Sequence, residues 1–286
     1  MQNQTSPLIL SFGVSDPVGA IGIQADLAVF AAFGCHALTV STALLIGDTA
    51  RVEDIQEIDP DWVSDQARVL LEDMTVAAIK IGAPGGIEHI TAIAEIVSDY
   101  PDVPLILDPF ISALPEQGLE DEEVVTALRQ LLIPQTTVLM LSQVELERLA
   151  ETWRDADPAD TMQADVDYLL ALGCEFVLVT GTPNAGHGDN ALRANTLFGS
   201  DGIVRHDAWQ HLSGSFSGAG STLSAALTAL MALEGGGGGD AAQAVRAAQD
   251  YTAGALAHAQ RFGMGKLVPN RFFQRLPRPD LPRPAQ

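Results

Sequence analysis

The sequence predicts an α/β fold with a central, mostly parallel sheet and helices on both of its faces. The first indication is the alternation of short apolar runs with longer amphipathic segments along almost the whole chain of 286 residues. The second is the hydrophobic share of 47%, which is enough for a substantial core. Strands joined through helices pair in parallel, because each helix carries the chain back across one face of the sheet. We expect residues 1–275 to form one domain.

The strands are predicted where short apolar runs end at turn-forming residues. In chain order they are 8–12, 37–44, 77–81, 104–107, 137–141 and 176–179. Two further strands, 194–198 and 203–206, flank Gly199-Ser200-Asp201-Gly202, a sequence typical of a hairpin.

The helices are predicted where the apolar residues are spaced for one helical face. In the segment 61–71, Trp62, Val63, Ala67 and Leu70 share such a face. The remaining predicted helices are 24–33, 87–97, 121–132, 144–152, 165–172, 220–233 and 241–258. The five glycines at 235–239 are expected to form a flexible loop, and the Pro-rich tail at 276–286 is expected to be extended or disordered.

The charge balance excludes some classes of partner. The formal net charge is −22, with 15 Lys and Arg against 37 Asp and Glu. Such a surface repels polyanions, so we expect neither a nucleic-acid partner nor an anionic membrane partner. No apolar run reaches the length of a membrane span. Cys35 and Cys174 lie far apart in the sequence, which suits a reducing compartment, and we expect a cytoplasmic protein.

A run of small residues at 213–221 leads directly into an apolar helix and is the most informative feature of the chain. The small residues Gly218, Ala219 and Gly220 let the backbone approach a ligand closely. The helix that follows offers unpaired N–H groups and the positive end of its dipole. These features favour a site for a phosphate, or for the charge that develops in phosphoryl transfer. The alternative is a glycine-containing helix start without a ligand.

Several residues follow predicted strands directly, namely Asp16, Asp108, Ser142 and Gly181. The carboxyl ends of parallel strands meet at one edge of the sheet, which is where α/β proteins bind ligands. The sequence lacks a P-loop, a nucleophile elbow and a dinucleotide fingerprint. Its six histidines also lack the spacing of a zinc site.

Phosphoryl transfer remains compatible with these residues. It needs an anion cradle, carboxylates that hold magnesium, and a group that accepts the hydroxyl proton. The segment 218–220 offers the cradle, and Asp108 and Glu145 are candidates for holding Mg²⁺, directly or through water. Each acid also fits the simpler role of a helix cap or a solvated turn residue.

Four segments carry a resemblance to a known family. The longest, from Ser15 to Asp26, is similar to the family's S-D-P-S-G-G-A-G-I-Q-A-D. Lys80-Ile81-Gly82 resembles its K-I-G, residues 103–109 resemble its V-V-L-D-P, and residues 263–265 with 269–273 resemble its closing segment. On these motifs the chain, from about residue 8 to 273, resembles the hydroxymethylpyrimidine/phosphomethylpyrimidine kinases of thiamine biosynthesis, which belong to the ribokinase-like superfamily.

The resemblance implies transfer of the terminal phosphoryl group of ATP, with Mg²⁺, to the hydroxymethyl group of a small pyrimidine. Many members then phosphorylate that phosphate again. The resemblance implies an anion hole at Gly218, Ala219 and Gly220, with Ser221 at the position of the family's proton-accepting cysteine. Members are often dimers, which leaves a homodimer open for this chain. The further site residues implied are Asp16, Gly19, Gly47, Lys80 and Gly82 for the substrate, Ser142, Glu145, Thr180 and Gly181 for the nucleotide, and Asp108 and Glu145 for the metal.

The sequence departs from the family where chemistry is expected. A hydroxyl at Ser221 gives up its proton far less readily than a thiol, whose pKa is about 8.5. Gly47 stands where the family has Gln or Glu to bind the aminopyrimidine. Ser142 stands in place of Asn, Ala83 in place of Met, and Thr180 in place of Lys.

Two functions are consistent with these departures. The first is a working kinase with a slow or altered base and a hydroxymethylpyrimidine-like substrate. The second is a diverged protein that binds a pyrimidine or a nucleotide without turnover, as a sensor or partner module. A positioned general base contributes about 10²–10⁴-fold to a rate, so its loss slows a kinase greatly. The kinase is the primary expectation, because the fold and the glycine loop are kept.

Overall fold

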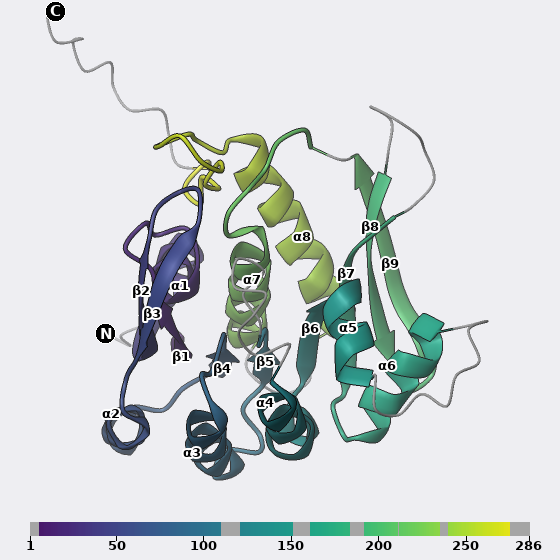
Figure 1. Cartoon of the computed structure of the whole chain (residues 1–286). Coiled ribbons are helices and arrows are strands. Elements are labelled where there is room, and N and C mark those ends of the chain that lie inside the picture. The colour runs from purple at the N-terminus through teal and green to yellow at the C-terminus, as the bar shows by residue number, and fades with distance from the viewer. Residues whose placement is uncertain are drawn as a thin grey trace, which may run out of the picture.

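A nine-stranded sheet runs through the part of the chain that this computed structural model describes, residues 6–109, 121–150, 161–183, 192–210, 212–234 and 240–274 (Figure 1). The strand order is β3-β2-β1-β4-β5-β6-β7-β8-β9. The six central strands are parallel, and they are β1 (Leu8–Ser15), β2 (His36–Gly47), β4 (Ala78–Ile81), β5 (Leu105–Leu107), β6 (Val138–Ser142) and β7 (Phe176–Pro183). Antiparallel strands complete both ends, with β3 (Val52–Glu57) beside β2, and β8 (Leu192–Gly199) and β9 (Gly202–Gln210) beside β7.

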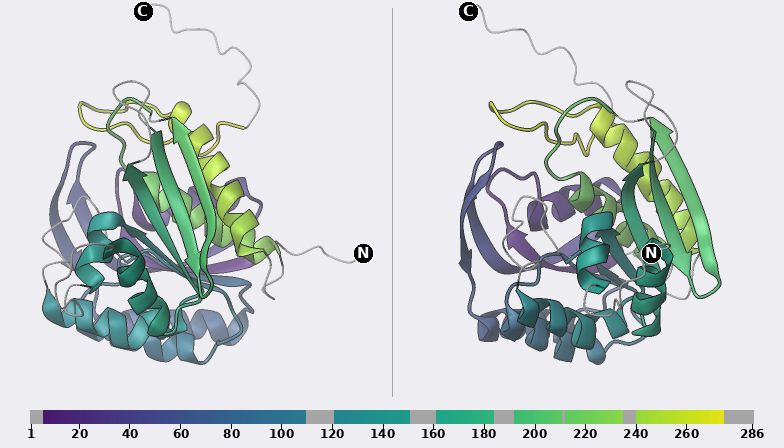
Figure 2. Two further views of the ribbon diagram at one scale, coloured as in Figure 1. Left: turned by 90° about the vertical axis from the view of Figure 1, so that its right-hand side faces the viewer. Right: turned by 45° about the vertical axis from the view of Figure 1, so that its right-hand side comes forward.

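Two helical layers cover the sheet, as Figures 1 and 2 show. One layer contains α2 (Pro60–Asp73), α3 (Ile87–Ser98), α4 (Glu122–Ala127), α5 (Gln143–Ala150) and α6 (Thr161–Ala171). The other contains α1 (Gly22–Ala32), α7 (Ala219–Leu233) and α8 (Ala241–Ala257). Because both faces are covered, every residue of β4 and β5 is buried. The strand β5 is a continuous apolar run, and β4 is apolar except for Lys80. The predicted fold class is confirmed by this arrangement.

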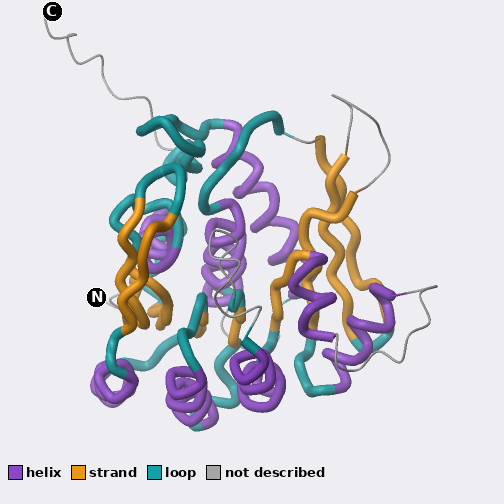
Figure 3. The backbone as a smooth tube through the Cα atoms, viewed as in Figure 1, coloured by secondary structure: helices purple, strands orange, loops and turns teal. Residues whose placement is uncertain are grey.

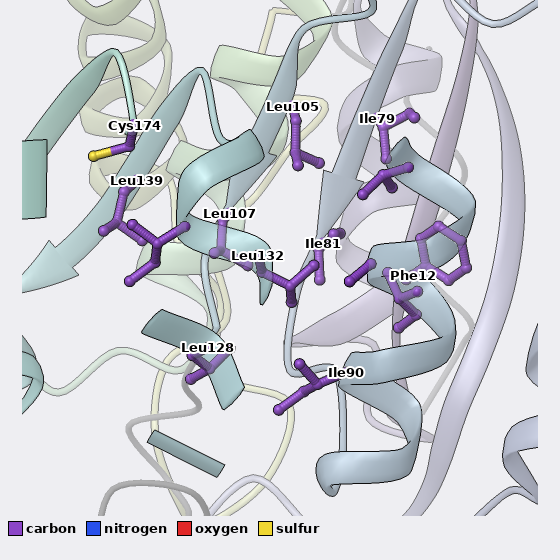
Figure 4. Close-up of a cluster of buried hydrophobic side chains, with 14 of the residues drawn as sticks. Phe12, Ile79, Ile81, Ile90, Leu105, Leu107, Leu128, Leu132, Leu139 and Cys174 are labelled. Atoms are coloured by element: carbon purple, nitrogen blue, oxygen red, sulfur yellow. The ribbon is translucent and has the colours of Figure 1, made fainter. Parts of the chain in front are cut away.

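The apolar core lies in two parts, one on each face of the sheet. Figure 4 shows the first part, where Phe12, Ile79 and Ile81 of the sheet meet Ile90 of α3. On the opposite face, Ala225, Ala226 and Ala229 of α7 are fully buried. These small side chains let α7 lie close to the sheet and to its neighbours α1 and α8, which places its first turn over the carboxyl ends of the parallel strands.

The main difference from the sequence prediction is the strand β3, which was not expected. Its sequence, Val-Glu-Asp-Ile-Gln-Glu, is mostly polar, and the strand pairs only with β2 at the edge of the sheet (Figure 3). An edge strand needs little apolar surface, and charges there discourage pairing with other chains, so its sequence carries no clear alternation.

Other differences concern the ends of elements. The predicted helix 121–132 ends its α-helical part at Ala127 and continues as a π turn (Leu128–Leu132) and a 3₁₀ turn (Ile133–Gln135). Pro134 cannot donate a backbone hydrogen bond, which limits further helix there. The predicted hairpin is confirmed as β8 and β9. The glycine loop at 235–239, the tail at 276–286 and the last two residues of the helix predicted at 144–152 lie outside the described residues.

Two findings bear on the predicted environment of the protein. None of the described helices is long and apolar enough to cross a membrane. Cys35 and Cys174 are both buried and unpaired with each other, since each is a free cysteine.

Candidate phosphate-binding site

The first turn of α7 presents unpaired backbone N–H groups. Gly218 precedes the helix in a left-handed conformation with φ of 90°, and no side chain caps the helix. Its carbonyl accepts hydrogen bonds from the amide (3.0 Å) and the hydroxyl (2.7 Å) of Thr222. The amides of Ala219, Gly220 and Ser221 have no hydrogen-bond partner within the described residues. They form a concentration of positive partial charge at the helix start.

Glycine is required at position 218 for two reasons. The left-handed conformation is costly for any residue with a Cβ atom. A Cβ atom would also overlap the carbonyl oxygen of Ala20 and lie 2.8 Å from Nη2 of Arg271. The loop is held from its other side, because the Ser217 amide donates to the Leu267 carbonyl and the Leu267 amide donates to the Ser215 carbonyl, both at 2.8 Å.

Arg271 fixes the loop before α1 and the start of α7 together. Its guanidinium donates to the Thr222 hydroxyl (3.1 Å) and to the carbonyls of Gly19 (2.9 Å) and Ala20. The residue is 5% exposed, and burial lowers its pKa to about 10, so the group is still charged at neutral pH. A buried positive charge thus lies directly behind the anion-attracting helix start.

Asp16 holds the turn before α1 through hydrogen bonds to backbone amides. One carboxylate oxygen accepts from the amide of Val18 at 2.9 Å, and the other accepts from the amides of Ala20 (2.8 Å) and Ile21 (2.9 Å). Asp16 thereby folds the turn that leads into α1. Its carbonyl accepts from the amide of Gly19, where φ is 74°.

A cavity of about 170 Å³ lies over the first turn of α7. We call it the phosphate cavity. It brings together residues that follow β5, β6 and β7 with the loop before α7. Eight of the predicted site residues line it, namely Asp108, Ser142, Glu145, Thr180, Gly218, Ala219, Gly220 and Ser221. The Ser221 hydroxyl makes no hydrogen bond within the described part of the chain.

Two carboxylates reach this cavity from different strand ends. Asp108 follows β5 and accepts a hydrogen bond from the Ser224 hydroxyl at 2.8 Å. Burial raises its pKa to about 6, although nearby Lys80 acts in the opposite direction and nearby Glu145 adds to the rise. Glu145 and Ser142 form a capping box at the start of α5, with the Ser142 amide 2.6 Å from Oε2 of Glu145 and the Glu145 amide 3.4 Å from Oγ of Ser142. The predicted capping alternative therefore holds for Glu145, which also borders the cavity.

Lys80 lies beneath the cavity and does not line it. Its ammonium is 3.0 Å from each carboxylate oxygen of Asp26 of α1, and both side chains are buried. The Ser11 hydroxyl donates to the same carboxylate at 2.6 Å. A Cβ atom at Gly82 would lie 3.3 Å from the Phe12 carbonyl oxygen and 3.6 Å from the Lys80 ammonium, so the glycine lets this backbone lie close to β1. The ion pair of Asp26 could not be predicted from the sequence, because its partner Lys80 is 54 residues away.

An apolar cavity of about 220 Å³, here called the base cavity, adjoins one end of the phosphate cavity. The two share Thr180, Ala219 and Gly220. The base cavity continues between β8, β9 and α8, and its further lining residues include Gly181, Trp209, Leu223 and Leu256. The amide of Gly181 donates to Oδ1 of Asn195 at 2.9 Å.

A small cavity of about 20 Å³, here called the acceptor cavity, adjoins the other end. It shares Ile21, Ser217 and Lys266 with the phosphate cavity, and it is also lined by Asp16 and Gly47. This volume suffices for about one water molecule. Of the predicted substrate residues, Gly19, Lys80 and Gly82 line none of the three cavities described above.

Gly47 lies at an irregularity in the pairing of β2 with β3. A Cβ atom there would be 2.8 Å from the carbonyl oxygen of Arg51 and 3.0 Å from the Cα atom of Val52. The glycine lets the two strands approach closely at their turn. The turn contacts the C-terminal loop, since the Lys266 amide donates to the Thr49 carbonyl at 2.7 Å (Figure 1).

Sequence reasoning missed Lys266 and Arg271 as parts of this region. Arg271 lies in the closing segment that carried the resemblance, and Lys266, which lies between the two parts of that segment, is one of only two lysines in the chain. These two signals were present, but the contact of this segment with Ala20 spans 251 positions and is invisible without the fold.

Comparisons with known proteins identify the family and the fold. The family model "Phosphomethylpyrimidine kinase" matches residues 16–270. The hydroxymethylpyrimidine/phosphomethylpyrimidine kinase of Escherichia coli K12 is 32% identical over 259 residues, covering 90% of this chain and 93% of that protein. The phosphomethylpyrimidine kinase structure from Clostridium difficile 630 has a TM-score of 0.71 at 27% identity, covering 88% of this chain and 100% of that one.

The fold extends to a second kind of kinase. The pyridoxal kinase of Staphylococcus aureus in complex with ADP has a TM-score of 0.81 at 21% identity, covering 95% of this chain and 96% of that one. At this identity the likeness concerns the fold alone. The fold is thus the ribokinase-like fold that the sequence predicted.

Proposed function

The chain belongs to the phosphomethylpyrimidine kinase family, and from this premise we propose that it transfers the terminal phosphoryl group of ATP to hydroxymethylpyrimidine, to its phosphate, or to both. The observation that carries the proposal is the row of three adjoining cavities, with the unpaired amides of α7 beneath the middle one. An apolar pocket, an anion site and a second pocket in series match a base, its phosphates and a phosphoryl acceptor.

The nucleotide binds with its base in the base cavity and its phosphates in the phosphate cavity. Thr180 and Gly181 stand at the junction of these two cavities. The amides of Ala219, Gly220 and Ser221 donate to phosphate oxygens, because a helix N-terminus favours anions and these donors have no other partner. The crystallised pyridoxal kinase relatives hold ADP or AMP-PCP, which supports the use of ATP.

Asp108 and Glu145 fit a role in holding Mg²⁺. Both border the phosphate cavity, and they are close enough for the charge of one to affect the pKa of the other. Mg²⁺ in kinase sites is bound by one or two carboxylates together with water and phosphate oxygens. When bound, the ion neutralises charge on the phosphates. The Ser142 amide orients Glu145 for this role.

The pyrimidine binds at the acceptor cavity, bordered by Asp16 and Gly47. Gly19, Lys80 and Gly82 lie outside this lining, where the Gly19 carbonyl accepts a hydrogen bond from Arg271 and Gly82 lies close to the backbone of β1. The cavity is too small for a pyrimidine in this conformation. Substrate entry therefore requires the turn at 47–51 to move away from the C-terminal loop.

Ser221 takes the place of the proton-accepting group. No basic group among the described residues is hydrogen-bonded to its hydroxyl. This favours a slow kinase. It also keeps a second function in view, a protein that binds a nucleotide or a pyrimidine without turnover, because Gly47 supplies no side chain to bind a pyrimidine edge.

The decisive test is phosphoryl transfer by the purified protein with ATP and Mg²⁺, using hydroxymethylpyrimidine, its phosphate and pyridoxal as separate acceptors. We expect phosphorylated product from one of the pyrimidines, detected by mass spectrometry together with ADP release. Binding of ATP and pyrimidine without product supports the second function instead. A protein that binds neither contradicts both.

A substitution tests the role of Ser221. Ser221→Cys is expected to raise turnover at least 10-fold, because a thiolate forms far more readily than an alkoxide. Ser213→Cys is the matched control, since Ser213 is an exposed residue that lines none of the three cavities. No gain in Ser221→Cys, with ATP affinity intact, contradicts the proposal that this position limits the rate.

We also propose a homodimer and a cytoplasmic location. Leu44 and Ile46 of β2 are 48% and 58% exposed on one face of the sheet edge, which supports contact with a second copy. Two free buried cysteines support a reducing compartment. Light scattering of the wild type and of a Leu44→Glu/Ile46→Glu variant tests the assembly, and a monomeric wild type contradicts it.

A further inference from the structure

The phosphate cavity has a charge imbalance that the residues discussed so far do not resolve. The whole chain carries a net charge of −22, and Asp108 and Glu145 add negative charge at the cavity itself. A nucleoside triphosphate brings several more negative charges. The helix amides and a magnesium ion offset part of this repulsion, but phosphoryl-transfer sites generally add a cationic side chain as well.

Lys266 is the only Lys, Arg or His among the described residues that line the phosphate cavity. The ammonium group makes no hydrogen bond or ion pair within the described residues, so its bonding capacity is unused. The other lysine, Lys80, is buried and committed to Asp26. Of the two lysines, only Lys266 is therefore free to meet a phosphate.

The position of Lys266 along the row of cavities is specific. Together with Ile21 and Ser217 it lines both the phosphate cavity and the acceptor cavity, which places it at the boundary between them. The residues shared with the base cavity, Thr180, Ala219 and Gly220, are at the opposite end. A phosphate chain that extends from the base cavity reaches Lys266 last, with its terminal group.

The backbone of Lys266 is held on both sides. Its own amide donates to the Thr49 carbonyl at 2.7 Å, and the next amide, of Leu267, donates to the Ser215 carbonyl at 2.8 Å. The residue thus bridges the turn beside the acceptor cavity and the loop before α7. A long flexible side chain on a fixed backbone can follow a phosphate group without disturbing the fold.

The end of the phosphate cavity nearer the base cavity carries no charged side chain among the described residues. Thr180, Ala219 and Gly220 line it there. The cationic group of this cavity therefore lies at the acceptor end.

Resting on the proposed function, we propose that Lys266 is a catalytic residue that binds the terminal phosphoryl group of the nucleoside triphosphate at the boundary with the acceptor. Its ammonium donates hydrogen bonds to the terminal phosphoryl oxygens. It offsets the negative charge there while the group passes from the nucleotide to the acceptor hydroxyl.

The test compares two nucleotides that differ in the terminal phosphate. The affinities of ADP and of the non-hydrolysable triphosphate AMP-PNP, each with Mg²⁺, are measured by calorimetry on the wild type and on Lys266→Met. We expect AMP-PNP binding to weaken about 10- to 100-fold and ADP binding to weaken less than about threefold, since one charge-assisted contact is lost only with the triphosphate. Lys266→Arg, which keeps the charge, is expected to retain most of the AMP-PNP affinity.

Arg68→Met is the matched control, because it removes one positive charge from the surface of α2, away from the three cavities. Equal weakening of ADP and AMP-PNP in Lys266→Met, or no change in either, overturns the assignment to the terminal phosphate. A wild type that binds neither nucleotide refutes the nucleotide-dependent function itself, and this inference with it. Unchanged thermal unfolding of Lys266→Met establishes that the fold is intact.

Discussion

The loops that follow β1 and β5 each begin with an aspartate, and the two aspartates differ in what their oxygens do. Asp16, after β1, accepts hydrogen bonds from three backbone amides of its own loop. Asp108, after β5, accepts one side-chain hydrogen bond, from Ser224, and borders the phosphate cavity. A place at a strand end therefore does not distinguish an aspartate that holds its own loop from one that is proposed to bind Mg²⁺. The two differ in how much hydrogen-bonding capacity their carboxylates leave unused.

The largest expected effect is on the rate of phosphoryl transfer, and it concerns Asp108 in the loop after β5. Asp108→Asn is expected to lower the rate of phosphoryl transfer at least 100-fold, because the amide binds Mg²⁺ far more weakly than the carboxylate. The rate is measured as ADP release at saturating ATP and Mg²⁺. Asp102→Asn, at an exposed position, is the control and should leave the rate unchanged. Equal rates for Asp108→Asn and the wild type would contradict the proposed role of Asp108 in holding Mg²⁺.

The same aspartate is expected to shape the pH dependence of stability in metal-free protein. Its pKa rises from 3.8 in the unfolded chain to about 6 in the folded protein, so the folded state binds the proton more tightly. The contribution of Asp108 is therefore most favourable below pH 4 and is lost as the pH rises to 6. The loss corresponds to at most about 3 kcal/mol.

Urea unfolding of the wild type and Asp108→Asn between pH 4 and 7 measures this difference. We expect the variant to be relatively more stable at pH 7 than at pH 4, because it carries no buried charge to penalise. A difference that is constant across this range would show that the pKa of Asp108 is not raised.

The loop after β1 also contacts the start of α7, through Ala20 and Gly218. Gly218→Ala is expected to lower the free energy of unfolding by about 3 kcal/mol. The new Cβ atom combines an unfavourable φ with overlap on the Ala20 carbonyl. Gly202→Ala is the matched control, because its φ is 100° but no atom lies within 4 Å of the added group, and about 1 kcal/mol is expected. Equal losses in both variants would mean that the close approach to Ala20 adds nothing.

A smaller loss is expected for Asp16→Ala, about 2 kcal/mol, because three buried or partly buried amides lose their acceptor. Asp48→Ala removes a similar acceptor from the amides of Ala50 and Arg51 in an exposed turn, where water replaces it. That variant is expected to lose less than 1 kcal/mol in the same unfolding measurement. Equal losses of unfolding free energy in Asp16→Ala and Asp48→Ala would contradict the stabilising role of the Asp16 carboxylate.

The sequence allowed prediction of the features that depend on local pattern. Buried strands such as β5 show as apolar runs, and the start of α7 shows as small residues before an apolar helix. The strand β3 was missed because its two faces are mostly polar. The partners of Asp16 and Lys80 could not be predicted either, because these hydrogen bonds and this ion pair exist only in the folded chain. The place of both residues near the substrate stays a prediction.

Arg271 joins the first loop of the chain to a segment more than 250 positions later, through its hydrogen bond to the Ala20 carbonyl. This has a consequence for biosynthesis. A nascent chain that has not yet emerged as far as Arg271 can form its early strands, but it lacks the group that holds the helix start in place. The site over α7 is thus completed only near the end of translation, so a chain truncated before this residue should be recovered as a folded sheet with a disordered start of α7.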